Sequence, residues 1–167
     1  MVTSEIREVL QDFISLAEDA AKRPTQVNEI LSRHDDFIGY CDASAFGAGG
    51  VWLGGECELE PLAWRVVFPP DITDKVVSYD NPNGTLTNSD LELAAILLHE
   101  MVLERAVNVR HRRAVIFSDN KPSVAWVRKM NPRSKRPIAH YLLRGLAMRQ
   151  RETQETLPEV LSVKGTL

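Results

Sequence analysis

Three short acidic motifs along this 167-residue chain each lie where a strand is expected to end or a helix to begin. Asp42 follows an apolar run, Glu92 lies in the first turns of a long helical pattern, and Asp119 ends a second apolar run. A fold can bring such positions together at one edge of a sheet. Two unit charges about 4 Å apart repel by on the order of 4 kcal/mol at an effective dielectric of about 20. Three gathered carboxylates therefore predict a bound divalent cation.

Apolar periodicity and turn residues divide the chain into nine expected elements. Helical spacing predicts four helices, at 4–22, 90–107, 121–130 and 138–151. Strand signals predict five strands, at 37–42, 51–53, 62–68, 113–118 and 160–163. The glycines at 47, 49 and 50 are expected to surround a tight connection, and the prolines and asparagines of 69–87 an irregular crossing.

The order of these elements predicts an α/β fold built on a mixed five-stranded sheet flanked by helices. Three consecutive strands form an antiparallel meander, whereas strands separated by helices lie parallel to one another. The first helix is amphipathic and precedes the main domain. We therefore expect two parts, an N-terminal helix with its linker over 1–35 and a main domain over 36–167.

The formal net charge of −3 conceals a strong division of charge along the chain. Residues 105–151 hold thirteen Lys or Arg and one acid, Asp119, which gives +12, and the remainder carries −15. A basic segment whose single acid is a proposed metal ligand suits phosphate binding. A helix with a solvated basic face explains the charge about as well. The candidate nucleic-acid contacts are Lys121, Arg128, Lys129, Arg133, Lys135 and Arg136.

Composition excludes several classes of protein. No run is long and apolar enough to span a bilayer, and the N-terminus lacks the layout of a secretory signal. These features predict a soluble intracellular protein, cytoplasmic or nuclear, with no membrane partner. Cys41 and Cys57 have no partners at metal-ligand spacing, so we expect reduced core thiols rather than a disulfide framework or a zinc site.

Each acid also has a structural interpretation. Ser89 and Glu92 match a capping box, in which the glutamate bonds the helix N-terminus. Asp119 suits a turn or an N-cap, and Asp42 suits a strand-end turn with Ser44. Asn88, like Ser89, could cap the helix as readily as contact a ligand. The histidines lack a pairing that marks an acid or base; they include His99, His111 and His140.

Taken together, the motifs resemble the ribonuclease H domain of retroelement reverse transcriptases, within the ribonuclease H-like superfamily. The resemblance rests on the three acidic motifs and the glycine-rich segment 47–52, and it extends from residue 37 to the C-terminus. The acids run Asp, Glu, Asp, whereas integrases and related transposases run Asp, Asp, Glu. The segment 23–25 is similar to the linker that precedes ribonuclease H in retrotransposon polyproteins.

This resemblance implies an endonuclease that cleaves the RNA strand of RNA–DNA hybrids as part of a reverse transcriptase polyprotein. It implies two Mg²⁺ ions, with Mn²⁺ as a substitute: Asp42 is shared between the ions, and Glu92 and Asp119 complete the shell of one. Ser44, Asn88 and Ser89 join the basic residues as contacts to the hybrid. The N-terminal helix is expected to contact a neighbouring reverse transcriptase domain.

One departure from the family pattern lies at the C-terminal end. Family members normally carry a fourth acidic ligand just after the last strand, but no acid follows Glu159 here. Glu159 is expected to begin that strand, on the wrong side of the sheet. We therefore expect a C-terminally truncated domain with one well-formed cation site and one weak site.

Two other functions are compatible with the sequence. The missing ligand favours a catalytically weak or inactive ribonuclease H-like module that binds nucleic acid or acts as a scaffold. A nuclease or resolvase of the same superfamily acting on DNA is the third reading, and the order of the acids counts against it.

Overall fold

The computed structural model describes residues 3–22, 35–55, 58–132, 136–153 and 156–163. The chain divides into two compact units, residues 1–33 and 34–167. The first contains helix α1 (Ser4–Lys22), with the bounds that the apolar spacing predicts. Apolar side chains at helical spacing are exposed on α1; they are Ile6, Val9, Leu10, Phe13 and Ile14. Taken by itself, α1 is an amphipathic helix with an uncovered apolar stripe.

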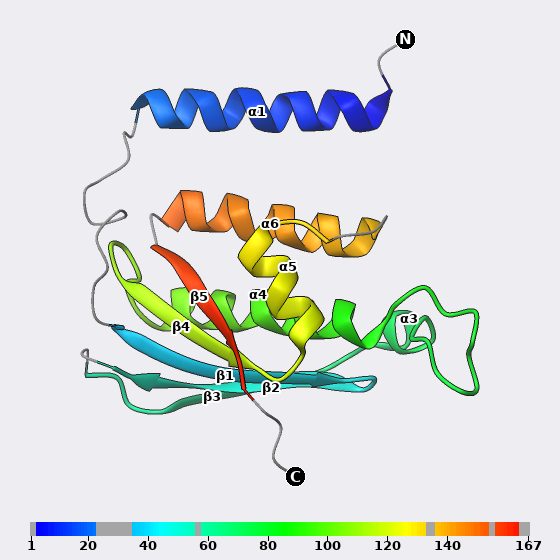
Figure 1. Cartoon of the computed structure of the whole chain (residues 1–167). Coiled ribbons are helices and arrows are strands. Elements are labelled where there is room, and N and C mark those ends of the chain that lie inside the picture. The colour runs from blue at the N-terminus through cyan, green and yellow to red at the C-terminus, as the bar shows by residue number, and fades with distance from the viewer. Residues whose placement is uncertain (1–2, 23–34, 56–57, 133–135, 154–155, 164–167) are drawn as a thin grey trace. The chain divides into compact units, whose positions relative to one another are not determined.

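The second unit is built on one five-stranded sheet (Figure 1). Its strands are β1 (Phe37–Ser44), β2 (Gly47–Gly54), β3 (Leu62–Val67), β4 (Arg113–Ser118) and β5 (Thr156–Ser162). They lie in the order β3-β2-β1-β4-β5. The pairs within β1, β2 and β3 are antiparallel, and β4 lies parallel to both β1 and β5. The predicted mixed sheet is confirmed, and the architecture fits a ribonuclease H-like fold.

Helices cover one face of this sheet (Figure 1). They are α4 (Asn88–Ala106), α5 (Lys121–Lys129) and α6 (Pro137–Thr153). Helix α4 packs against β1 and β2 on one side and against α6 on the other, and α5 packs against β5. Fully buried side chains fill the space between sheet and helices; the largest include Trp52, Leu93, Ile96, Leu103, Ile116 and Leu146. This double contact explains why α4 buries residues all round its surface.

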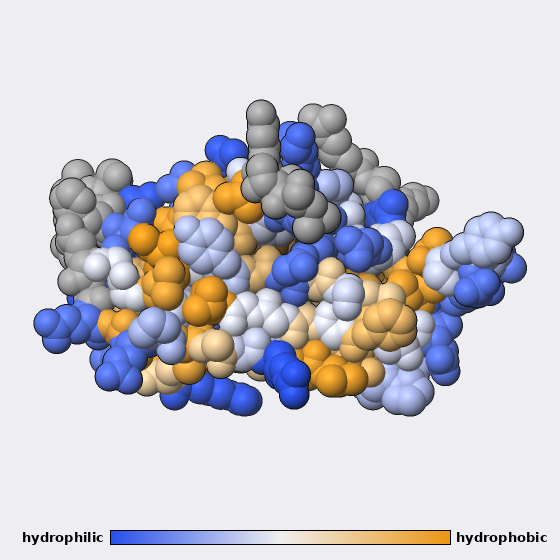
Figure 2. Space-filling view, turned by 90° about the horizontal axis from the view of Figure 1, so that it is seen from below, coloured by the Kyte–Doolittle hydropathy of each residue, from blue (hydrophilic) through white to orange (hydrophobic). Residues whose placement is uncertain are grey.

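No helix among the described residues of this unit covers the opposite face of the sheet. Alternation along the strands places Tyr40 and Phe117 there, with their rings stacked at 5.0 Å. Figure 2 shows this side of the molecule, where hydrophobic side chains lie between polar ones. The sheet is thus apolar on both faces and covered by helices on one.

The expectation for the glycine-rich segment was wrong. The glycines expected to form a connection lie inside β2, and the turn falls at Ala45 and Phe46. None of the described glycines has a positive φ. Instead, a Cβ on Gly50 would lie 2.6 Å from the carbonyl oxygen of Tyr40, so these positions need a small residue rather than a flexible one. The crossing 69–87 is largely irregular, as expected, and within it Pro70–Thr73 forms the short helix α3, with proline at its first position.

The last strand begins at Thr156 rather than at 160. The strand includes Pro158, although proline lacks the backbone N–H that strand pairing uses. The proline is tolerated because β5 is an edge strand. The other predicted elements form, with ends shifted by a few residues at most. Among the described helices, none combines the length and apolarity that a membrane crossing requires.

Candidate metal centre

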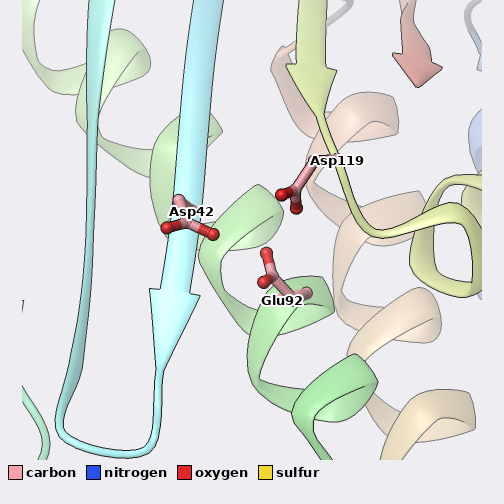
Figure 3. A group of neighbouring side chains, drawn as sticks. All are labelled: Asp42, Glu92 and Asp119. Carbon is pink, nitrogen blue, oxygen red and sulfur yellow. The ribbon is translucent and has the colours of Figure 1, made fainter. Parts of the chain in front are cut away.

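The three acids converge at the C-terminal ends of the neighbouring strands β1 and β4 (Figure 3). Asp42 projects from β1, Glu92 from the second turn of α4, and Asp119 follows β4 directly. In the parallel pairing of β1 with β4, Tyr40 lies opposite Phe117, and each aspartate follows two residues later. One oxygen from each carboxylate lies within 4.8 Å of the other two. The fold therefore assembles the cluster from three segments that are distant in sequence.

Glu92 is the buried member, with 2% of its surface exposed, whereas both aspartates are exposed. Burial raises the pKa of Glu92 to about 8, and the charge of Asp42, a hydrogen bond with Asp42 and the charge of Asp119 act in the same direction. A hydrogen bond from the backbone of Ala43 opposes them. Without a cation, Glu92 is therefore largely protonated at neutral pH.

A cation fits this cluster. Oε2 of Glu92 is buried and has no hydrogen-bond partner among the described residues. An ion between the carboxylates would occupy that oxygen and offset the repulsion that raises the pKa. The neighbouring thiol of Cys41 is buried and free, as predicted, and burial raises its pKa to about 12. The donors are thus oxygens alone, and the three carboxylates can hold a metal ion. Cys57 lies outside the described residues.

The capping roles that the sequence allowed for Glu92 and Asp119 belong to other residues. At the start of α4, the carboxylate of Asp90 accepts hydrogen bonds from the backbone N–H (2.9 Å) and the hydroxyl (2.6 Å) of Thr87. At the start of α5, the side chain of Asn120 accepts one from the N–H of Ser123 at 3.0 Å. The capping-box interpretation of Glu92 was therefore wrong, and both acids face the cluster instead (Figure 3).

The predicted polar contacts lie around the cluster. Asp42 precedes the β1–β2 turn, in which the hydroxyl of Ser44 accepts from the N–H of Phe46 at 3.3 Å. Asn88 and Ser89 occupy the first turn of α4, four and three residues before Glu92. This spacing places both on the same side of the helix as Glu92.

The predicted basic residues divide into three groups. Lys121, Arg128 and Lys129 are exposed on α5, whereas Arg133 and Lys135 lie outside the described residues. Arg136 is engaged within the protein. Its guanidinium donates to the hydroxyl of Thr87 (3.3 Å), lies 3.9 Å from Asp90 and sits over the ring of Trp126. Arg136 thus supports the cap of α4.

Glu159 lies within β5 rather than at its start. Its carboxylate accepts a hydrogen bond from Arg113 at 2.6 Å. Ser162, three residues later, pairs with Ser118 beside Asp119. At about 3.3 Å per residue, Glu159 lies about 10 Å short of the cluster along the strand. Among the described residues, the cluster therefore contains three acids.

A hollow of about 320 Å³ on the uncovered sheet face adjoins the acids. Asp42 and Asp119 contribute to its wall, together with Tyr40, Val51 and Phe117. Our sequence reasoning missed this feature. The available signal was that β1 and β4 carry apolar residues on both faces, which indicates strands with two apolar surfaces.

No family model matches this chain, and no curated protein matches its sequence. Its function is therefore inferred from the fold and the site.

Proposed function

We propose that this chain is a metal-dependent endonuclease that cleaves the RNA strand of RNA–DNA hybrids, as the ribonuclease H domain of a retroelement reverse transcriptase. The observation that carries the proposal is the convergence of Asp42, Glu92 and Asp119, together with a buried Oε2 of Glu92 that has no hydrogen-bond partner in the described part of the chain. The order Asp, Glu, Asp and a sheet that fits a ribonuclease H-like fold support the same assignment.

Mg²⁺ is the proposed cofactor, with Mn²⁺ as a substitute, because the three ligands are hard oxygens. Bound ions of this kind activate the attacking water and stabilise the departing 3′ oxygen. Asp42 and Asp119 are held by neighbouring parallel strands, which fixes their separation. Glu92 is held by its hydrogen bond from Ala43 and by burial against the sheet. The chain thus supplies a pre-organised acidic pocket.

The hybrid is proposed to lie across the starts of α4 and α5. Lys121 begins α5 two residues after Asp119, and Arg128 and Lys129 are exposed in its last turn. These cations suit the phosphates of one strand. Asn88 and Ser89 are uncharged donors near the cluster, and Ser44 offers a hydroxyl oxygen that can accept. All three suit the 2′-hydroxyls of the RNA strand, which distinguish a hybrid from duplex DNA. The exposed stripe of α1 is proposed to contact a neighbouring reverse transcriptase domain.

The test is incubation of the chain with labelled RNA–DNA hybrid, duplex RNA or duplex DNA, in Mg²⁺ and in Mn²⁺. We expect cleavage of the RNA strand of the hybrid alone. Asp42→Asn removes a direct ligand and is expected to lower the rate at least about 100-fold. The matched control is Asp71→Asn, which neutralises an exposed acid of α3 outside the cluster. Equal rates for Asp42→Asn and wild type would contradict the proposal.

A second candidate is a module that binds hybrids or acts as a scaffold without efficient cleavage. The observation that favours it is the three-acid cluster, with Glu159 occupied by Arg113 and distant from the site. In this case, the same assay gives tight binding of the hybrid and no product in either metal.

A further inference from the structure

His99 is a completely buried histidine of α4 that the proposed chemistry does not use. Its ring stacks on Trp52 of β2, with the ring centroids 4.0 Å apart and the planes 7° from parallel. Trp64 of β3 donates its indole N–H to Nδ1 of His99 at 2.7 Å. Trp52 donates its own to the backbone oxygen of His99 at 2.9 Å. We refer to Trp52, Trp64 and His99 as the His99 cluster.

The strands leave room for this histidine by carrying glycine beneath it. A Cβ on Gly39 of β1 would overlap Nε2 of His99 and lie 2.7 Å from the ring of Trp52. A Cβ on Gly50 of β2 would lie 2.8 Å from Nδ1 of His99 and 2.9 Å from the indole nitrogen of Trp64. The imidazole of His99 therefore packs directly against the backbones of β1 and β2, and along β1 it lies at Gly39.

The protonation state of His99 agrees with its packing against the strand backbones. Nδ1 accepts a hydrogen bond, so a neutral ring carries its proton on Nε2, which is buried and has no partner among the described residues. Burial lowers the pKa of His99 to about 3, so the ring stays neutral. His99 therefore does not act as an acid or a base near neutral pH. Its contacts can instead fix the position of α4 on the sheet.

His99 and Glu92 stand seven residues apart on α4, which places them on the same face and about 10 Å apart along the axis. Their partners on β1 have a similar separation. His99 sits over Gly39, Glu92 is bonded to Asp42 and to the backbone of Ala43, and three to four residues of strand span about 10–13 Å. Helix α4 is thus attached to β1 at two points.

We propose that His99 is a positioning residue for the metal centre. By fixing where α4 lies along β1, it holds Glu92 beside Asp42 and sets the spacing of the ligands. This inference rests on the proposed metal-dependent function, because it assigns the geometry of the same site. A residue that merely fills the core would contribute to stability without affecting metal affinity in the folded protein.

The test measures the Mn²⁺ affinity of the full chain by electron paramagnetic resonance, below the onset of unfolding. Trp64→Phe removes the N–H donor and keeps an aromatic ring, and His99→Leu removes the acceptor and the ring stack. We expect each to weaken Mn²⁺ binding about tenfold, as for other residues that orient metal ligands. The matched control is Leu146→Ala, a cavity in α6 outside the His99 cluster, which lowers the melting temperature and leaves Mn²⁺ affinity unchanged.

The possible outcomes are distinct. Wild-type Mn²⁺ affinity in folded Trp64→Phe and His99→Leu overturns the inference, and so does an equal loss in Leu146→Ala. If His99→Leu does not fold, Trp64→Phe alone decides. Failure of the wild-type chain to bind Mn²⁺ overturns the proposed function and this inference with it.

Discussion

Glu92 combines deep burial with two acidic neighbours, so its ionisation opposes folding when no cation is present. Glutamine keeps the size of the side chain and removes the charge. We predict that, above pH 8, Glu92→Gln raises the unfolding free energy of the metal-free protein by on the order of a few kcal/mol, and its melting temperature accordingly. The same variant should lose the stabilisation that Mg²⁺ gives to the wild type. Thermal unfolding with and without Mg²⁺ measures both effects.

The control for this substitution is Glu60→Gln, which neutralises an exposed glutamate outside the cluster. It should leave both the metal-free melting temperature and the Mg²⁺ response unchanged. A metal-free Glu92→Gln protein that melts below the wild type at this pH would contradict the cost of ionising the buried Glu92 that we describe.

At the scale of single elements, α5 carries the cations that we propose to bind the hybrid. We predict that the double variant Arg128→Ala, Lys129→Ala weakens hybrid binding at low salt. Each lost phosphate contact should also reduce the slope of log K against log salt by about 0.9. Titrations at several salt concentrations measure that slope.

A matched double variant separates this effect from the loss of net charge. Lys75→Ala with Arg105→Ala removes two exposed cations from outside α5. It should retain the wild-type salt slope. Equal slopes for both double variants would remove α5 from the interface.

The fit between α4 and the first two strands makes a second prediction for an element. Gly50→Ala places a methyl group 2.6 Å from the carbonyl oxygen of Tyr40, and we expect it to destabilise the protein by about 1–3 kcal/mol. The control is Gly145→Ala in α6, where the nearest of the atoms that a Cβ would meet is Cδ2 of Leu97 at 3.8 Å. That change should stabilise the protein by about 0.5–1 kcal/mol, because alanine favours the helix. Urea unfolding of both variants gives the comparison.

Element type and order could be predicted from the sequence because apolar periodicity is a local property. α1 and β4 formed with the predicted bounds. The glycines of β2 could not be placed, because glycine signals both flexibility and small size, and only the position of His99 and Tyr40 shows that size decides. The start of β5 could not be placed either, because a strand that includes Pro158 is tolerated only where it lies at the edge of the sheet.

The candidate site, too, could be predicted from the sequence only in part. The three acids were identifiable from the strand ends and helix start that precede or contain them. The cap of α4 was misassigned by two residues, because Thr87 with Asp90 and Ser89 with Glu92 are both chemically suitable. The choice depends on where the helix begins, and element boundaries are the weakest part of a sequence prediction. The contacts of Arg136 with Thr87 and Asp90 could not be predicted, because they join segments far apart in the chain.

At the scale of the whole molecule, two buried groups shape the pH dependence of stability. Glu92 has its pKa raised from 4.5 to about 8, so its favourable contribution is present at low pH and declines as the pH rises between these values. His99 has its pKa lowered from 6.5 to about 3, so its contribution is present above 6.5 and declines as the pH falls towards 3. Between pH 4.5 and 6.5, a rise in pH lowers the stability contribution of Glu92 and raises that of His99, so the two changes oppose each other.

We therefore predict that, for these two groups, metal-free stability is greatest between about pH 4.5 and 6.5 and falls on either side. Mg²⁺ should reduce the alkaline decline, because it replaces the proton on Glu92. Chemical denaturation across this pH range, with and without Mg²⁺, measures the profile. A metal-free profile that continues to rise from pH 6.5 to 8, and that Glu92→Gln leaves unchanged, would contradict the assignment.

The origin of the three carboxylates in β1, α4 and the end of β4 has a consequence for the folding of the protein. An ion held by all three carboxylates acts as a removable cross-link. It joins β1, α4 and the end of β4 to one another. Amide hydrogen exchange should slow in all three segments at once when the ion is added and quicken again with a chelator. Metal loading is thus a reporter of intact tertiary structure as well as a requirement for chemistry.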